Sequence, residues 1–281
     1  LDDSMRDTYM TRMRSKKLVT FLNDPEMAKL FDNKNQFDEV FKEFISRDYL
    51  DAVNCDLAEA TRFYNENEIG FAKMLDLACG KGAEIIRMAD FENAEAFYNY
   101  IKEKGFGVVE EYLINHDKIR EVYKPALNTM RMITIIGDDG QPHLFFAAQK
   151  FGVHGRFIDV HGIHAPIDLE TGVVHFPFHS GNTDTDLIYT KHPDTGYDLT
   201  EYEVPMFREA KDMILKAAMK VPEMRYVGWD VAVTNKGPKI VEGNDYTAYD
   251  YMQLPQQNPG RVGVIPDILK LVPSFKDELY K

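Results

Sequence analysis

The chain has 281 residues, enough for about two domains, of which 44% are hydrophobic and 28% are charged. This composition excludes a disordered or low-complexity protein. With 33 Lys and Arg against 46 Asp and Glu, the net charge is −13 at pH 7. A nucleic-acid partner is therefore not expected, since binding one needs a basic face. An anionic ligand would need cations gathered locally, or a metal ion to carry it.

The cysteines and the apolar runs predict a cytoplasmic protein. The two cysteines, Cys55 and Cys79, form neither a disulfide framework nor a metal-binding pair. No apolar run approaches the roughly 18 residues of a membrane helix, and the first residues lack the apolar centre of a signal peptide. The sequence does not begin with Met, which suggests an N-terminally truncated part of a longer protein. The oligomeric state cannot be read from the sequence.

The first half of the chain is predicted to hold a helical segment and then a small α+β unit. Residues 1–65 are expected to be helical because apolar side chains recur there at helical spacing. A strand at 70–75 leads into a Gly-rich turn at 79–82. A helix over about 92–104 and a strand at 107–113 complete the unit.

The second half is predicted to be a mixed region of strands and helices. Strands near 131–136 and 143–150 are joined by a turn of two glycines and two aspartates. A loop-rich stretch, 151–200, carries most of the histidines and is followed by an amphipathic helix over about 205–220. Strands at 226–234 and 238–244 precede a Pro-rich tail. This order indicates an α+β class with two subdomains.

The segment LDLACGKG at 75–82 resembles the nucleotide-binding turn of an S-adenosylmethionine-dependent methyltransferase. Such a fold needs an acidic residue at the end of the next strand, about 20 residues further on, to hold the ribose. Here a helix is expected in that place, and the next strand ends at Glu110 and Glu111. The methyltransferase is therefore kept only as an alternative. A phosphate-binding P-loop is excluded, because its pattern needs Gly at Leu75 and Ser or Thr at Gly82.

The strands at 226–234 and 238–244 form a predicted hairpin that carries acidic side chains. If residues 235–237 are a three-residue loop, Thr234 pairs with Pro238 and Asp230 lies opposite Glu242. Their Cβ atoms would be about 4.5–5.5 Å apart, with Asn244 on the same face. Two carboxylates and an amide oxygen suit Mg²⁺. The alternative is an exposed polar strand face without a ligand.

Taken together, these motifs resemble the ATP-grasp superfamily: a lysine strand, a Gly-rich loop, an acidic hinge strand, and Asp followed after eleven residues by Glu-x-Asn. The sequences at 110–134, 192–196 and 227–244 are similar to the sugar-transfer-associated ATP-grasp group, which is alpha-L-glutamate ligase-like. The resemblance covers about residues 30–270. It implies two α+β subdomains that grip a nucleotide, preceded by a helical segment. The expected parts are a helical segment at 1–68, a lid subdomain at 69–115 and a C-terminal subdomain at 116–281.

The resemblance also implies which residues would bind ATP. Two lysines, Lys34 and Lys73, would face the phosphates, although Lys34 could equally be a surface lysine at a helix start. A lysine on an apolar strand, as Lys73 is, needs an anionic partner because burying its charge unpaired is costly. The remaining ATP-binding residues would be the flexible loop, the hinge that bonds adenine, and a ribose acid: Gly80, Lys81, Gly82, Glu110, Glu111, Tyr112, Leu113 and Asp117.

Two cations are expected to be catalytic. Arg131 corresponds to an arginine near the transferred phosphoryl group, where a planar guanidinium makes bidentate contacts. Lys150 stands where the family usually has arginine, and it keeps the charge without the fork geometry. The metal ligands would be Asp230, Glu242 and Asn244.

One stretch departs from the family. Within 149–165 the usual Asp-Asn step and paired glycines are replaced, here by Asp159-Val160 and His161-Gly162-Ile163-His164. This change concerns recognition of the substrates. Nearby, His175 and His179 flank a proline, which rules out helical zinc spacing and leaves loop polar groups or substrate contacts as their roles.

The implied function is an ADP-forming ligase that joins a carboxylate to an amine or thiol through an acyl phosphate and depends on ATP and Mg²⁺, or Mn²⁺. The partners would be a small-molecule carboxylate and an amine, such as a peptide or a cell-envelope precursor, which the sequence does not identify. The alternatives are an ATP-dependent phosphotransferase on the same fold, the methyltransferase, and a nucleotide-binding protein without turnover.

Overall fold

A computed structural model describes residues 3–74, 82–182 and 184–280. The chain divides into two compact units. The larger comprises the segment up to Phe31 together with that from Asn115 onward, and the smaller is Asp32–Ile114. The sequence placed residues 32–68 in a helical N-terminal segment. In the structure they share one compact unit with most of the expected lid subdomain, residues 69–115.

The smaller unit is a four-stranded antiparallel sheet, in the order β1-β4-β2-β3, packed against two helices. Its core contains Phe63 of the first helix and Phe97 and Ile101 of the second, all fully buried against the sheet. An Asp56–Glu59 capping box starts the first of these helices. The elements are α4 (Lys34–Val40), α5 (Lys42–Ile45), β1 (Tyr49–Asp51), α6 (Leu57–Glu66), β2 (Ile69–Lys73), β3 (Glu84–Arg87), η1 (Met88–Asp90), α7 (Ala94–Lys104) and β4 (Val108–Glu111).

The larger unit is built on a seven-stranded antiparallel sheet in the order β10-β9-β7-β6-β5-β12-β13. Its strands are β5 (Thr129–Ile136), β6 (Pro142–Phe151), β7 (Ile163–Pro166), β9 (Phe178–Ser180), β10 (Ile188–Tyr189), β12 (Tyr226–Thr234) and β13 (Gly237–Asn244). A separate ribbon pairs β8 (Val173–Val174) with β11 (Tyr202–Glu203). The helices are α1 (Asp3–Arg6), α2 (Arg12–Leu22), α3 (Pro25–Asp32), α8 (Asp117–Val122), α9 (Phe207–Ala218), η2 (Asp250–Gln253), η3 (Pro255–Gln257), α10 (Ile265–Leu271), η4 (Pro273–Phe275) and α11 (Lys276–Leu279).

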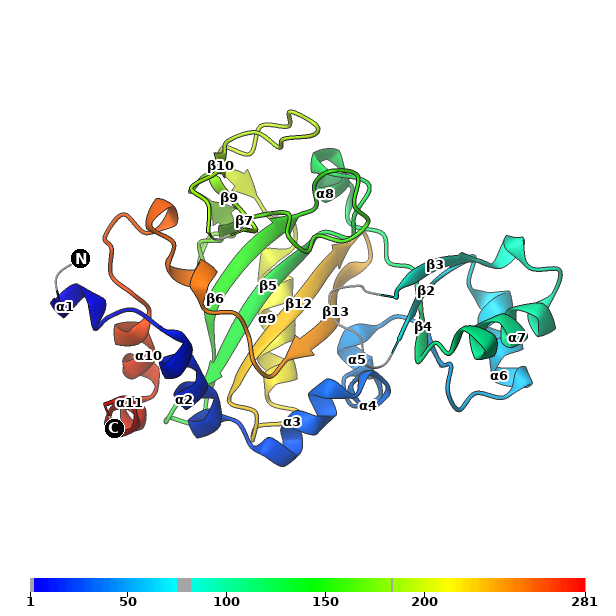
Figure 1. Ribbon diagram of the computed structural model, residues 1–281, viewed down its shortest axis with the longest axis horizontal. Coiled ribbons are helices and arrows are strands. Elements are labelled where there is room, and N and C mark those ends of the chain that lie inside the picture. Colours follow the sequence, from blue (N-terminus) through cyan, green and yellow to red (C-terminus); the bar gives the residue numbers. More distant parts are fainter. Residues whose placement is uncertain (1–2, 75–81, 183, 281) are drawn as a thin grey trace. The chain divides into compact units, whose positions relative to one another are not determined.

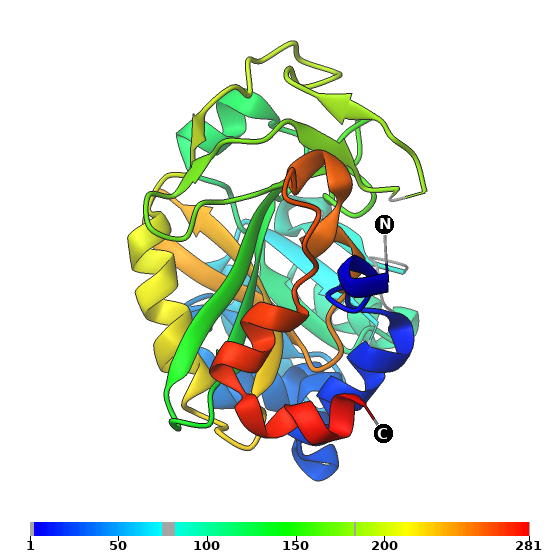
Figure 2. The same cartoon turned by 90° about the vertical axis from the view of Figure 1, so that its left-hand side faces the viewer.

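Helices cover the two faces of this sheet differently (Figure 1). The helix α9 packs across β5, β6, β12 and β13 on one face. On the other face, α2, α10 and α11 pack against Ile133, Ile135 and Tyr226 at one end of the strands. Figure 2 shows α9 in yellow on one side of the sheet and these helices in blue and red on the other. Farther along the same strands, this face carries the paired polar side chains of Arg131 and Asp230.

The α+β class is confirmed, and most of the expected strands and helices are present. The prediction of continuous helix over residues 1–65 is wrong at β1, which pairs with β4 some sixty residues later. The strand β3 and the short strands within 151–200 were also not expected. These strands have two to four residues, too few for an alternation pattern to show.

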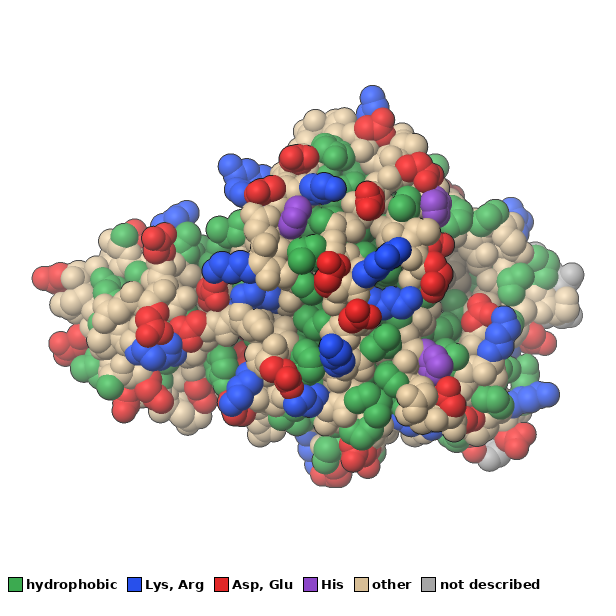
Figure 3. All heavy atoms as spheres, turned by 180° about the vertical axis from the view of Figure 1, so that it is seen from behind, with side chains coloured by type: hydrophobic (Ala, Val, Ile, Leu, Met, Phe, Trp, Pro, Cys, Tyr) green, Lys and Arg blue, Asp and Glu red, His purple; other side chains and the backbone are tan. Residues whose placement is uncertain are grey.

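Charges of both signs are spread over the surface. On the face drawn in Figure 3, acidic and basic side chains are interspersed with apolar ones, and the described residues show no continuous basic patch there. Among the described residues, no helix is both long and apolar enough to cross a bilayer.

Candidate functional site

The β12–β13 hairpin places two carboxylates side by side. Asp230 pairs directly with Glu242, as the sequence predicted. The predicted turn is wrong by one residue, however, because Thr234 pairs with Gly237 and not with Pro238. The Thr234 hydroxyl closes the shorter loop by donating to the carbonyl of Gly237, which has a φ of 126°. A β-bulge beside Asp230 then restores the predicted pairing.

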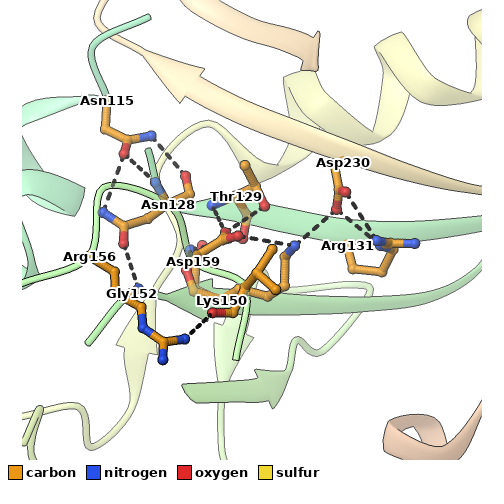
Figure 4. A network of polar contacts seen from close by, with 11 residues as sticks. Asn115, Asn128, Thr129, Arg131, Lys150, Gly152, Arg156, Asp159 and Asp230 are labelled. Carbon is orange, nitrogen blue, oxygen red and sulfur yellow. Dashed lines mark hydrogen bonds and ion pairs between the residues drawn. The ribbon is translucent and has the colours of Figure 1, made fainter. Parts of the chain in front are cut away.

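Asp230 is held by two cations from neighbouring strands. Arg131, opposite it on β5, donates from Nε to Oδ1 and from Nη2 to Oδ2, each at 3.0 Å. Lys150 on β6 donates to Oδ1 at 3.1 Å (Figure 4). Burial works against ionisation, but these two charges hold the pKa of Asp230 below its ordinary value. Asp230 is therefore an anion at neutral pH.

Lys150 bridges Asp230 to a second carboxylate, that of Asp159, 3.3 Å from its Nζ. Asp159 is fixed in turn by Thr129, whose backbone N–H and hydroxyl both donate to Oδ2 at 2.7 Å (Figure 4). Although burial favours the neutral form of Lys150, the two aspartates raise its pKa. Asp159 was not among the site residues predicted from the sequence. A lysine on a mostly apolar strand was the signal that an acidic partner had to be near.

Thr247 is a second residue that the sequence did not reveal. Its hydroxyl accepts a hydrogen bond from Nη1 of Arg131 at 3.1 Å. The approach depends on Gly228, because a Cβ there would lie 2.4 Å from Oγ1 of Thr247 and 3.1 Å from Nη1 of Arg131. Arg131 is thus fixed through all three of its nitrogen atoms, and the guanidinium plane has one orientation. Burial opposes its charge, yet Asp230 and Glu242 are among the groups that raise its pKa.

The oxygen atoms of this cluster fit a hard divalent cation. An ionised carboxylate offers about four lone-pair directions, and Asp230 uses three of them for Arg131 and Lys150. Glu242, opposite, is exposed. Asn244 donates from Nδ2 to the carbonyl of Gly228 at 3.2 Å, which leaves its Oδ1 to act as a ligand. Within the described part of the chain, no three His, Cys, Asp or Glu side chains form a metal-binding group, so such a site would depend on Asn244 as well.

The smaller unit contains its own network of buried charges. Glu110 on β4 contacts Nζ of Lys73 at 2.5 Å and Nη2 of Arg47 at 2.7 Å, and Arg47 also contacts Asp38 at 3.3 Å. Burial opposes the ionisation of Glu110, but the two cations lower its pKa. Burial dominates at Asp38 and raises its pKa to about 6. The anionic partner that the sequence required for Lys73 is, in this structure, Glu110.

The other predicted residues of the smaller unit lie around this network. Lys34 is the first residue of α4, and its charge is one of those that lower the pKa of Asp38. The backbone N–H of Glu111 donates to Asp48 O at 2.8 Å, and that of Tyr112 to Ile69 O at 3.1 Å. These hinge N–H groups therefore hold the sheet together. The buried side chain of Leu113 ends the hinge segment.

The remaining predictions concern the flexible loop and the ribose acid. Gly80 and Lys81 lie outside the described residues, as does the rest of the methyltransferase-like segment before Gly82, whose φ is 67°. Asp117 is exposed in the first turn of α8, and its carboxylate accepts a hydrogen bond from Asn235 in the β12–β13 turn at 3.1 Å.

Comparison with known proteins specifies the family. The model of the sugar-transfer associated ATP-grasp family matches residues 81–263, more than half of the chain. The chain belongs to this family. A search of curated protein sequences found no match.

Solved ATP-grasp structures share the fold at low sequence identity. The ATP-grasp ligase PsnB complexed with a minimal precursor is 15% identical at a TM-score of 0.51, with 96% of this chain and 76% of that chain covered. PsnB with a phosphomimetic variant of the precursor, Mg and ADP is 14% identical at 0.50, and 92% of this chain spans only 61% of that one. D-alanyl-alanine synthetase A from Vibrio cholerae O1 biovar eltor is 12% identical at 0.51, covering 92% and 68%.

Proposed function

We propose that the protein is an ATP- and Mg²⁺-dependent ligase that activates a carboxylate as an acyl phosphate and joins it to an amine or thiol, releasing ADP. The observation that carries the proposal is the Asp230–Glu242 pair beside Arg131 and Lys150 on one sheet face of an ATP-grasp fold. Such a set of charges suits phosphoryl transfer, in which catalysis is mostly positioning and neutralisation of charge.

The nucleotide-binding residues are proposed from the family resemblance. Lys34, Lys73 and the loop of Gly80, Lys81 and Gly82 would contact the phosphates, residues 110–113 the adenine, and Asp117 the ribose. For Lys73 the structure adds a reason: its contact with Glu110 fixes the orientation of the side chain before the nucleotide arrives. Crystals of PsnB contain Mg and ADP, which supports the same ligands here.

Asp230, Glu242 and Asn244 would hold Mg²⁺, or Mn²⁺ in its place. When bound there, the ion neutralises phosphate charge, which allows a protein with a net charge of −13 to take an anionic nucleotide.

The remaining chemistry falls to Arg131 and Lys150, which would donate hydrogen bonds to the oxygens of the transferred phosphoryl group. A carboxylate oxygen attacks the γ-phosphorus, and the bond from phosphorus to the bridging oxygen of ADP breaks. The lone pair of the amine or thiol then forms a bond to the acyl carbon. The bond from this carbon to the phosphate oxygen breaks, and its electrons leave with phosphate. The nucleophile releases its proton to water. Lys150 supplies single donors where the family usually has an arginine fork.

A phosphotransferase would use the same residues without the second step, and it remains the alternative. The methyltransferase suggested by residues 75–82 is not supported, because that fold needs a parallel sheet and the strands described here pair antiparallel. The PsnB structures contain a precursor, which favours a peptide or another small carboxylate as substrate. We further propose a cytoplasmic location, where ATP is supplied.

Ligand-induced stabilisation and hydroxylamine trapping test the proposal together. Mg²⁺–ATP, and not S-adenosylmethionine, should raise the melting temperature of the wild type, and less so in Asp230→Asn and Glu242→Gln than in the exposed control Glu203→Gln. A panel of carboxylic acids with hydroxylamine, which traps acyl phosphates as hydroxamates, should then reveal the acid that is activated. ADP release with a stable phosphorylated product and no hydroxamate would favour the phosphotransferase.

A further inference from the structure

Polar side chains continue along the sheet face beyond Lys150. Lys150 on β6 pairs with His164 on β7, and His164 pairs with His179 on β9. Directly paired residues project to the same face, so both histidines share the face that carries Arg131 and Asp230. Their ring centroids are 5.9 Å apart. The row therefore runs from the carboxylate pair through the cations to two imidazoles.

The two histidines are buried without complete hydrogen bonding. His164 is 8% exposed and His179 is 0% exposed, and neither Nε2 atom has a hydrogen-bond partner among the described residues. The same is true of Oε1 of Gln257, whose Nε2 donates to the carbonyls of His164 and Pro177, each at 3.0 Å. Leaving such groups unpaired is costly, and most buried polar atoms are paired. Three orphaned atoms on adjoining side chains point to a ligand.

The hydrogen-bonding roles of these atoms define the ligand. Nδ1 of His179 lies 2.7 Å from the carbonyl oxygen of Ser180 and must donate to it. In the neutral ring, Nε2 of His179 is then an acceptor. Oε1 of Gln257 is an acceptor as well. A ligand that pairs with both Nε2 of the neutral His179 ring and Oε1 of Gln257 must donate hydrogen to them, which a carboxylate cannot do.

The charges around the row favour a neutral donor. Burial, with smaller effects of His179 and Lys150, lowers the pKa of His164 to about 4, so its ring is uncharged at neutral pH. The rings of His164 and Tyr251 pack in a T-shaped arrangement at a centroid distance of 5.4 Å. A cation would lose its hydration on burial between these uncharged rings. An uncharged amine keeps its N–H donors and a nucleophilic lone pair.

We propose that His164, His179 and Gln257 form the binding site for the amine nucleophile, taking a neutral primary amine next to the acyl phosphate whose phosphoryl oxygens Lys150 and Arg131 would contact. This inference rests on the proposed ligase function. Arg131 and Lys150 donate hydrogen bonds at one end of this row of side chains, and His179 and Gln257 accept them at the other. The donors suit the acyl phosphate and the acceptors suit the amine, which are the two reactants of the C–N bond. The amine forms the C–N bond with its lone pair as the C–O bond to phosphate breaks, and its surplus proton passes to water.

Substitutions at His179 separate this role from a structural one. In His179→Asn the amide nitrogen can still donate to Ser180, but no atom remains at the Nε2 position, whereas His179→Gln keeps a polar atom there. With the acid found by hydroxylamine trapping and the twenty amino acids as amines, His179→Asn should lower kcat/KM for the amine about 10- to 100-fold, mainly through KM. His179→Gln should recover part of this loss. The control His143→Gln, which removes a contact to Asp139 near the β5–β6 turn, should match the wild type.

Hydroxamate formation and the melting temperature of the variants distinguish loss of the amine site from a structural defect. Hydroxylamine is small and is used in excess, so it should not need the amine site. The loss of hydroxamate formation in His179→Asn should therefore be at least ten times smaller than the loss of amide formation. Equal losses in both, with a lowered melting temperature, would show a structural histidine and overturn the inference. An unchanged KM for the amine, or a product formed only with thiols or alcohols, would also overturn it while leaving acyl-phosphate formation intact. If the wild type yields no hydroxamate at all, the proposed function itself fails.

Discussion

Replacing Glu110 by Gln tests the charge network of the smaller unit. The carboxylate is 5% exposed and bridges Arg47 and Lys73. Gln has nearly the same size but no charge, so Lys73 and Arg47 would both lose the carboxylate that they share. Breaking a buried ion pair by removing one member costs about 3–5 kcal/mol. We expect the lower end, about 3 kcal/mol, since Asp38 still contacts Arg47 and Lys73 is 15% exposed.

Hydrogen–deuterium exchange measures this loss where it occurs. The single tryptophan, Trp229, lies in the larger unit, so its fluorescence does not report directly on the smaller one. Amides of β2 and β4 that exchange through unfolding should exchange roughly 150-fold faster, since about 1.4 kcal/mol corresponds to a factor of ten. The control is Glu111→Gln, which keeps the oxygen that accepts the N–H of Asp48. An increase below tenfold, or one equal to that in the control, would refute the reasoning.

Three further changes probe the same structure. Gly228→Ala would force a Cβ to within 2.4 Å of Thr247 Oγ1. We expect urea unfolding to show a destabilisation of about 1–3 kcal/mol, together with loss of ADP formation. Unchanged stability would contradict the close approach. Arg131→Lys should lower ADP formation at least tenfold with little change in melting temperature, because one ammonium cannot reproduce the two contacts to Asp230. The pKa of Asp38 is raised from 3.8 to about 6, so between pH 4 and 7 the folded state binds more protons at this carboxyl than the unfolded state does. As the pH rises through this range, the unfolding free energy should therefore fall by about 2.4 kcal/mol relative to Asp38→Asn. Parallel pH profiles would show that Asp38 is not the cause.

The hairpin shows how far sequence reasoning reaches. Strand boundaries and the pairing of Asp230 with Glu242 followed from local alternation and turn chemistry. The turn itself was predicted one residue too long, and the pairing is right because a bulge compensates. A bulge leaves no clear signal in a single sequence, whereas the two acidic positions and Asn244 do.

Contacts made across distant parts of the chain could not be predicted in the same way. Lys73 was expected to need an anion, but Glu110 is its partner only because β4 pairs with β2. Asp159 and Thr247 reach Lys150 and Arg131 from loops whose paths depend on the whole unit. The row of His164 and His179 requires β7 and β9 to pair. Sequence spacing had ruled out helical zinc geometry at His175 and His179, but it could not place His164 and His179 beside the cations.

Oxygen transfer from the carboxylate tests the acyl-phosphate ligase most directly. The substrate acid, labelled with ¹⁸O in its carboxylate, is incubated with ATP, Mg²⁺ and the amine, and the released phosphate is analysed by mass spectrometry. Activation at the γ-phosphate followed by attack at the acyl carbon predicts one ¹⁸O atom in each phosphate, and this signal should be lost in Glu242→Gln. Amide formed together with unlabelled phosphate, or a phosphorylated acid as the final product, would contradict the account.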